Sequence, residues 1–103
     1  MARVVVTEPA DADAADILTY LAREAGSVAA VKYGRSFDAL YQRLASHPES
    51  GAARPALGPH VRIGIVLPYV VICRHVAGDD IVAILRIVHG SRRITRKLLD
   101  RAP

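Results

Sequence analysis

The sequence predicts a single α+β domain over residues 1–103, in which an N-terminal strand and a two-helix hairpin pack on an antiparallel sheet of about four strands. Three observations support this prediction. The length of 103 residues fits one domain. The first half holds two segments with helical periodicity, and the second half holds three short β-branched runs. A segment rich in proline and glycine separates the two halves.

The chain opens with a short strand and a helix. Residues 3–7 are mostly valine and are followed by Glu8-Pro9, which predicts a strand that ends there. Residues 11–24 predict an amphipathic helix that ends at Gly26, with aspartates in its opening turns, where the helix dipole favours anions. The apolar stripe of this helix consists of Ala14, Ile17, Leu18, Leu21 and Ala25.

A second helix follows Gly26. Ser27 is a suitable N-cap, and the helix is expected to continue to His47-Pro48. Because the break between the helices is short, they are expected to form an antiparallel hairpin. Aromatic residues at helical spacing are expected in the core rather than in a stacking platform: Tyr20, Tyr33, Phe37 and Tyr41, with Ala30, Leu40 and Leu44 on the same stripe of the second helix.

The second half predicts a sheet. Residues 48–60 contain three prolines and two glycines and predict a loop without regular structure. Three strand-like runs follow, at residues 61–67, 69–76 and 81–88, and their connections are so short that the strands must form an antiparallel meander. The last two runs are apolar on both faces. The hairpin is therefore expected to cover one face of the sheet, and a partner the other.

Charge is distributed unevenly along the chain. Residues 1–53 carry a net charge of −2 and residues 54–103 a net charge of +6, and twelve of the fourteen basic residues are arginine. Arginine is suited to bidentate contacts with carboxylates and phosphates, so the second half is expected to face an acidic partner. Residues 90–103 predict a basic tail in which Ile94, Leu98 and Leu99 form one or two helical turns.

Several classes of protein are excluded. Cys73 is the only cysteine, so no internal disulfide can form, and no Cys/His spacing is typical of a zinc site. No metal or other cofactor is expected, and Cys73 is expected to be a buried small apolar residue. The longest apolar run, residues 63–73, is shorter than the roughly 20 residues of a membrane span. We expect no membrane association, no export signal and a location in the reducing cytoplasm.

The order of elements resembles the RelE/ParE superfamily of bacterial toxins from type II toxin–antitoxin pairs, over nearly the whole chain. The most specific segment is residues 84–92 (ILRIVHGSR), which is similar to the arginine, two apolar residues, His-Gly, small residue, arginine pattern that closes ParE-type toxins. Residues 48–51, 61–62 and 69–71 also match in order. Cys73 departs from the pattern, because an aromatic residue is common at this place in the strand.

The superfamily has two branches, which differ in mechanism. The resemblance implies either a ParE-like inhibitor of DNA gyrase, without catalytic residues, or a RelE-like ribosome-dependent mRNA endoribonuclease. RNA cleavage requires a general base, cations for the phosphorane and an acid. Arg62, Arg86 and His89 supply part of that set, with Glu49 as the nearest base. A lysine cluster is missing, and residues 50–78 contain no carboxylate, so the gyrase inhibitor is favoured.

The resemblance also implies two partners, DNA gyrase and an acidic antitoxin, with the antitoxin joining the toxin in a hetero-oligomer. The residues expected to contact the target are Arg86, His89, Arg92, Arg93 and Arg96. The residues expected to contact the antitoxin, on the second apolar face of the sheet, are Tyr69, Val71, Ile84, Ile94 and Leu98.

Three of these assignments have structural alternatives. Arg86 lies mid-strand, where a charge is costly to bury unless it is paired, so it is expected to emerge on the partner-binding face. The alternative is a salt bridge to an acid of the helix hairpin. His89 is either an acid, base or donor toward the target, or a strand-end histidine that a neighbouring carbonyl satisfies. The arginines of the tail either bind phosphates or the acidic groups of a partner, or are exposed to solvent without a partner.

Overall fold

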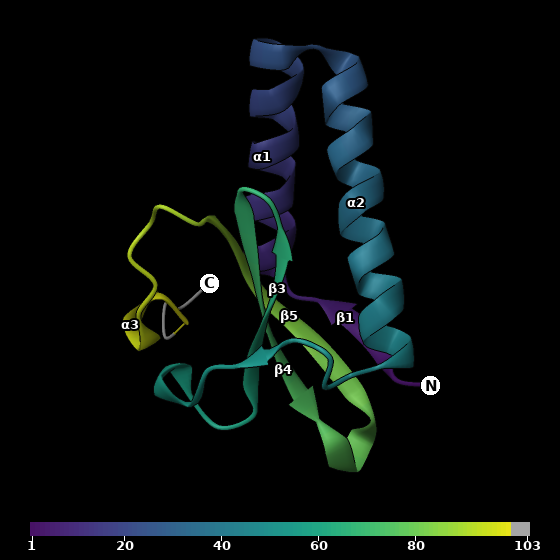
Figure 1. Cartoon of the computed structure of the whole chain (residues 1–103), viewed down its shortest axis with the longest axis vertical. Coiled ribbons are helices and arrows are strands. Elements are labelled where there is room, and N and C mark those ends of the chain that lie inside the picture. Colours follow the sequence, from purple (N-terminus) through teal and green to yellow (C-terminus); the bar gives the residue numbers. More distant parts are fainter. Residues whose placement is uncertain (100–103) are drawn as a thin grey trace.

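The computed structural model describes residues 1–99, so the last four residues of the predicted tail lie outside the described residues. Figure 1 shows a long helix hairpin against one side of a sheet and a short C-terminal helix on the other. The helices are α1 (Glu8–Ala25), α2 (Ser27–Ser46) and α3 (Arg96–Leu99). The strands are β1 (Arg3–Val6), β2 (Ala52–Ala53), β3 (Val61–Val66), β4 (Tyr69–Val76) and β5 (Ile81–His89). The predicted α+β class is confirmed.

The helix hairpin is antiparallel, as predicted, but both helices begin differently (Figure 1). Helix α1 starts at Glu8, because Thr7 accepts a hydrogen bond from the Ala10 N–H and Pro9 fits the first turn, where no N–H is needed. Gly26 caps both helices with a φ of 94°, so Ser27 is the first residue of α2 rather than its N-cap. Within residues 1–99, no helix is long and apolar enough to cross a membrane.

The sheet is mixed, with strand order β1-β5-β4-β3-β2. Strands β3, β4 and β5 form the predicted antiparallel meander. The all-antiparallel prediction is wrong for β1, which pairs in parallel with β5, because a strand whose partner lies far along the chain has no short turn to fix its direction. The prediction of an irregular loop over residues 48–60 is also wrong, since β2 pairs with Arg62 and Ile63, and Pro55–Leu57 form a 3₁₀ turn, η1.

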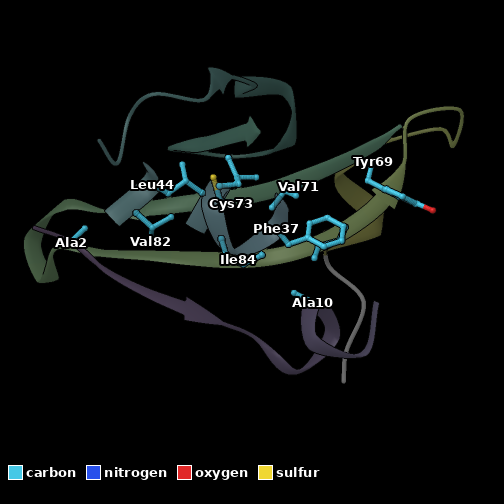
Figure 2. Close-up of a cluster of buried hydrophobic side chains, with 11 residues drawn as sticks. Ala2, Ala10, Phe37, Leu44, Tyr69, Val71, Cys73, Val82 and Ile84 are labelled. Atoms are coloured by element: carbon cyan, nitrogen blue, oxygen red, sulfur yellow. The ribbon is translucent and has the colours of Figure 1, made fainter. Parts of the chain in front are cut away.

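The main core lies between the hairpin and the sheet. Figure 2 shows Phe37 and Leu44 of α2 gathered with side chains of β4 and β5. Tyr33 and Tyr41 pack against this cluster, as predicted. Tyr20 does not, since 53% of its surface is exposed. The far end of the hairpin extends beyond the sheet (Figure 1), so an aromatic residue in the second half of α1 finds no strand to cover it.

Cys73 lies in this core with 1% of its surface exposed, as predicted. Burial raises the pKa of its thiol from 9.0 to about 11, against a smaller lowering by Arg62. Because the thiolate is the reactive species, we expect a thiol reagent such as DTNB at pH 8 to modify the folded chain at least about a hundredfold more slowly than the chain in denaturant. Equal rates in the two states would show that the core opens freely at Cys73.

Helix α2 approaches β3 most closely at Gly64. A Cβ atom at this position would lie 2.9 Å from both Cδ atoms of Leu40, which is itself only 3% exposed. We expect Gly64→Ala to lower the free energy of unfolding by about 1–3 kcal/mol, because the buried side chain of Leu40 must shift to make room for the added methyl group. Urea unfolding followed by circular dichroism measures this loss. Gly78→Ala is the matched control, since a Cβ there meets nothing within 4 Å.

Candidate functional site

The chain covers the outer face of its own sheet. Beyond β5, α3 turns back beside η1 (Figure 1). Ile94, Leu98 and Leu99 pack there against a second apolar cluster, on the face away from the hairpin: Leu57, Val61, Val70, Ile72 and Val88. The expectation that only a partner would cover this face is therefore wrong. The tail was predicted to form one or two helical turns, and it forms one, α3, which includes Leu98 and Leu99 but not Ile94. The apolar side of this turn packs on the sheet.

Three of the residues predicted to contact an antitoxin lie on the other face. Tyr69, Val71 and Ile84 belong to the core beneath the hairpin, and Figure 2 shows all three in that cluster. Val71 and Ile84 are fully buried, and Tyr69 is 7% exposed. Successive side chains of a strand point to opposite faces of the sheet. Because β4 and β5 are apolar on both faces, the sequence did not show which of the two sets of side chains faces the helices. Their assignment to an exposed surface is wrong, whereas Ile94 and Leu98 are half-buried at the outer surface.

Arg86 is buried and paired rather than exposed toward a partner. Its Nε donates to Oδ2 of Asp13 at 2.6 Å, and its Nη2 donates to Oδ1 at 3.0 Å. This bidentate bond raises the pKa of the Arg86 guanidinium above its ordinary value, although burial acts in the opposite direction. The predicted partner contact is therefore wrong, and the alternative, a salt bridge to an acid of the hairpin, is what the structure contains.

Asp13 joins three elements through this pair. Its Oδ2 also accepts a hydrogen bond of 2.9 Å from the backbone N–H of Ile87. Strand β1 pairs with β5 only as far as Ile84, so the carboxylate satisfies a donor on the edge that β1 leaves open. Arg86 in turn places Nη1 3.4 Å from the carbonyl oxygen of Leu98 in α3. The sequence predicted that Asp13 lies in the opening turns of a helix, but it did not predict the pairing with Arg86.

His89 ends β5 in an exposed position next to the tail. Its Nδ1 accepts a hydrogen bond of 3.0 Å from the Ser91 N–H, and its ring meets Tyr69 edge-on at 5.8 Å between centroids. Acceptance at Nδ1 places the proton of the neutral ring on Nε2. Ser91 and Tyr69 thus hold the ring in a fixed orientation. The structural alternative predicted a hydrogen bond from the ring to a backbone carbonyl, whereas the ring accepts one from a backbone N–H.

The basic residues of the tail form an exposed patch. Arg92, Arg93 and Arg96 are all exposed, and within residues 1–99 none of their side chains makes a hydrogen bond or an ion pair. The half-buried residues Ile94, between Arg93 and Arg96, and Leu98, just after Arg96, hold the segment on the outer cluster. We name Arg92, Arg93 and Arg96 the tail patch. The tail patch presents three exposed guanidinium groups on a segment whose apolar side chains pack against the outer cluster.

The structure does not bring the two candidate ribonuclease arginines, Arg62 and Arg86, together. Arg62 stands opposite Cys73 of the main core, whereas Arg86 stands opposite Ile72 of the outer cluster, so the two arginines start from opposite faces of the sheet. Arg62 donates to the carbonyl oxygens of Glu49 and Gly51, at 3.0 and 2.8 Å, and so holds the loop after α2.

The candidate base Glu49 is also engaged elsewhere. Its Oε2 lies 3.2 Å from Nδ1 of His75, a residue that the sequence did not single out, and Nε2 of the same ring lies 3.8 Å from Oδ1 of Asp80. This group ties the loop after α2 to the end of β4. In the part of the chain that the structure describes, no three His, Cys, Asp or Glu side chains are placed to hold a metal ion.

Comparison with known proteins gives a family match and several structural matches. The family model described as the ParE toxin of the type II toxin–antitoxin system parDE matches residues 4–94. A chain from the solved structure of the chromosomal ParDE toxin–antitoxin system of P. aeruginosa superposes with a TM-score of 0.71 at 25% identity, over 86% of this chain and 96% of that one. No curated protein matches the sequence. The family match spans the hairpin, the sheet except for Arg3, and the start of the tail, and the chain therefore belongs to the ParE toxin family of type II toxin–antitoxin systems.

Proposed function

We propose that this ParE-family toxin inhibits DNA gyrase in the cytoplasm and is neutralised by a cognate acidic antitoxin. The observation that carries the proposal is the tail patch, in which Arg92, Arg93 and Arg96 stand exposed on a segment anchored by Ile94 and Leu98. An inhibitor of this kind requires no acid or base. It requires enough interface to hold gyrase in its DNA-cleaved state, and exposed arginines next to an apolar anchor are suited to that task.

His89 is the second member of the proposed target surface. It precedes the tail patch, and its hydrogen bond from Ser91 leaves Nε2–H as the donor. A donor held in one orientation loses little conformational entropy when it binds a phosphate or a backbone carbonyl. Arg86 does not belong to this surface. It supports the surface from behind, through Asp13 and Leu98.

The arrangement of the ribonuclease candidates disfavours the second branch. Arg62 and Arg86 hold backbone and an aspartate, and Glu49 pairs with His75. General acid–base catalysis requires groups that converge within hydrogen-bond reach of one substrate atom. Arg62 and Arg86 start from opposite faces of the sheet, and Glu49 is paired with a histidine, which argues against a shared substrate position.

A paired assay tests the proposed target. Purified toxin is added to a gyrase reaction with supercoiled plasmid, and separately to translating ribosomes. We expect linear plasmid to accumulate with toxin concentration and the message to remain uncut. Antitoxin, added at equal concentration, is expected to suppress the linear product. Cleaved mRNA without linear plasmid would instead support the hypothesis of a ribosome-dependent endoribonuclease.

A further inference from the structure

The last strand and the tail form a segment without acidic residues. Residues 81–99 contain no aspartate or glutamate, and their basic residues are Arg86, Arg92, Arg93, Arg96 and Lys97. Only Arg86 is buried, where Asp13 balances its charge. The other four are exposed, and within residues 1–99 none of them forms an ion pair. The tail patch and the neighbouring Lys97 therefore present positive charge that the described part of the chain does not neutralise.

The same segment lacks exposed apolar side chains. Among the described residues, every large apolar side chain that is exposed precedes residue 81. Ile94, Leu98 and Leu99 of the tail are half-buried and pack against the outer cluster. The centre of a protein–protein interface is usually apolar or aromatic and poor in charge. A phosphate backbone, by contrast, is contacted by cations and hydrogen-bond donors. The composition of this surface therefore favours a nucleic acid over an acidic protein as its ligand.

The backbone that carries the arginines is held at both ends. The Arg92 N–H donates to the carbonyl oxygen of His89 at 2.9 Å, which closes a turn, and the Gly90 N–H donates to the carbonyl oxygen of Pro68 at 2.7 Å. At the other end, Leu98 packs in the outer cluster and holds α3 on the sheet. Because this backbone is ordered before any ligand binds, less conformational entropy is lost on binding than for a free basic tail.

The three side chains of the tail patch have the chemistry that phosphate requires. A guanidinium group is planar, always charged, and donates two parallel hydrogen bonds to a pair of phosphate oxygens. Duplex DNA offers such oxygens at high density, with one negative charge for about every 1.7 Å of helix axis. Several arginines on one short segment can therefore reach neighbouring phosphates together.

We propose that the tail patch binds the phosphate backbone of duplex DNA. This proposal rests on the proposed inhibition of gyrase, and it assigns the three arginines to the DNA of the cleaved complex rather than to the gyrase protein. Contacts with phosphates carry no sequence information. Binding of the toxin alone to DNA is therefore weak, independent of sequence and strongly dependent on salt.

The test is a titration of a short fluorescein-labelled DNA duplex with toxin in the absence of gyrase, followed by fluorescence anisotropy at several salt concentrations. The variant combines Arg92→Ala, Arg93→Ala and Arg96→Ala. We expect the unaltered toxin to bind the duplex. In the variant, the slope of log Kd against the logarithm of the salt concentration is expected to fall by about 2 to 3, because each phosphate contact contributes about 0.9.

Two controls accompany this titration. The matched variant replaces Arg3, Arg23 and Arg54 with alanine, which removes the same charge from exposed positions elsewhere, and it is expected to keep the slope of the unaltered toxin. Poly-L-glutamate represents an acidic protein surface. Unlabelled duplex is expected to displace the labelled one at a charge concentration at least about tenfold lower than poly-L-glutamate, because of its higher charge density. Circular dichroism checks the fold of each variant, and Arg92→Ala with Arg93→Ala replaces the triple variant if that one does not fold.

Three results would overturn the proposal. The first is an absence of duplex binding by the unaltered toxin at low salt. The second is an equal loss of slope in the matched variant, which shows a general charge effect. The third is equal displacement by poly-L-glutamate, which assigns the patch to an acidic protein. The gyrase assay is run alongside. Linear plasmid without duplex binding by the toxin removes this proposal alone, whereas patch-dependent duplex binding without linear plasmid removes only the gyrase assignment.

Discussion

Replacing Asp13 with alanine is expected to lower the free energy of unfolding by about 3 kcal/mol. The substitution leaves the guanidinium of Arg86, only 10% exposed, without its carboxylate, and it leaves the Ile87 N–H without an acceptor. A buried charge and an edge-strand donor thus lose their partner in one step. Urea unfolding at neutral pH, followed by circular dichroism, measures the loss.

The control for this substitution lies on the same helix. Asp16→Ala removes an exposed carboxylate that has no hydrogen bond or ion pair within residues 1–99, and it is expected to change stability by less than about 0.5 kcal/mol. Asp13→Asn keeps an acceptor for Ile87 but loses the charge, so an intermediate effect is expected. If Asp13→Ala and Asp16→Ala were equally mild, the bidentate pair would not support the fold.

Neutralising the tail patch is expected to weaken gyrase inhibition by about tenfold to a hundredfold. The variant combines Arg92→Ala, Arg93→Ala and Arg96→Ala. Each exposed arginine contributes modestly to binding an acidic surface, and three together reach this range. The salt dependence of inhibition is expected to fall as well, since fewer counterions are displaced. The concentration of toxin that gives half-maximal linear plasmid, at two salt concentrations, is the measurement.

This variant is expected to fold normally, because the three side chains are exposed and unpaired within the described residues. A matched triple substitution at Arg3, Arg23 and Arg54, which are exposed elsewhere, removes the same charge and is expected to retain inhibition. Full inhibition by the tail-patch variant would move the target surface to another part of the molecule. Truncation after Val88 is a poorer test, because it also removes Ile94, Leu98 and Leu99 from the outer cluster.

The sequence predicted most of the regular structure correctly. Helix α2 and the three strands of the meander were found within one or two residues, because their periodicity and their turn residues are local signals. The start of α1 was missed, since Pro9 suits the first turn of a helix as well as the end of a strand. The two-residue strand β2 was missed because it forms only against β3.

The site was predicted less well than the fold, and Arg86 shows why. Its sequence position required either a partner or an exposed surface, and the choice depended on whether an acid of the hairpin could reach it. Asp13 reaches it because α1 begins at Glu8, next to the open edge of β5. Residues 13 and 86 are far apart in the sequence, so no local pattern connects them.

The sequence by itself determined the α+β class, the helix hairpin, the meander, the buried cysteine and the resemblance to the ParE family, all of which follow from local periodicity, composition and short motifs. Only the tertiary structure decided which face of the apolar strands lies under the hairpin, and that α3 covers the other face. It also decided that Arg86 is buried in an ion pair with Asp13, whereas the arginines of the tail patch are exposed. Each of these depends on contacts between residues distant in the chain. Such contacts are fixed by how the layers pack together, which a single sequence does not display.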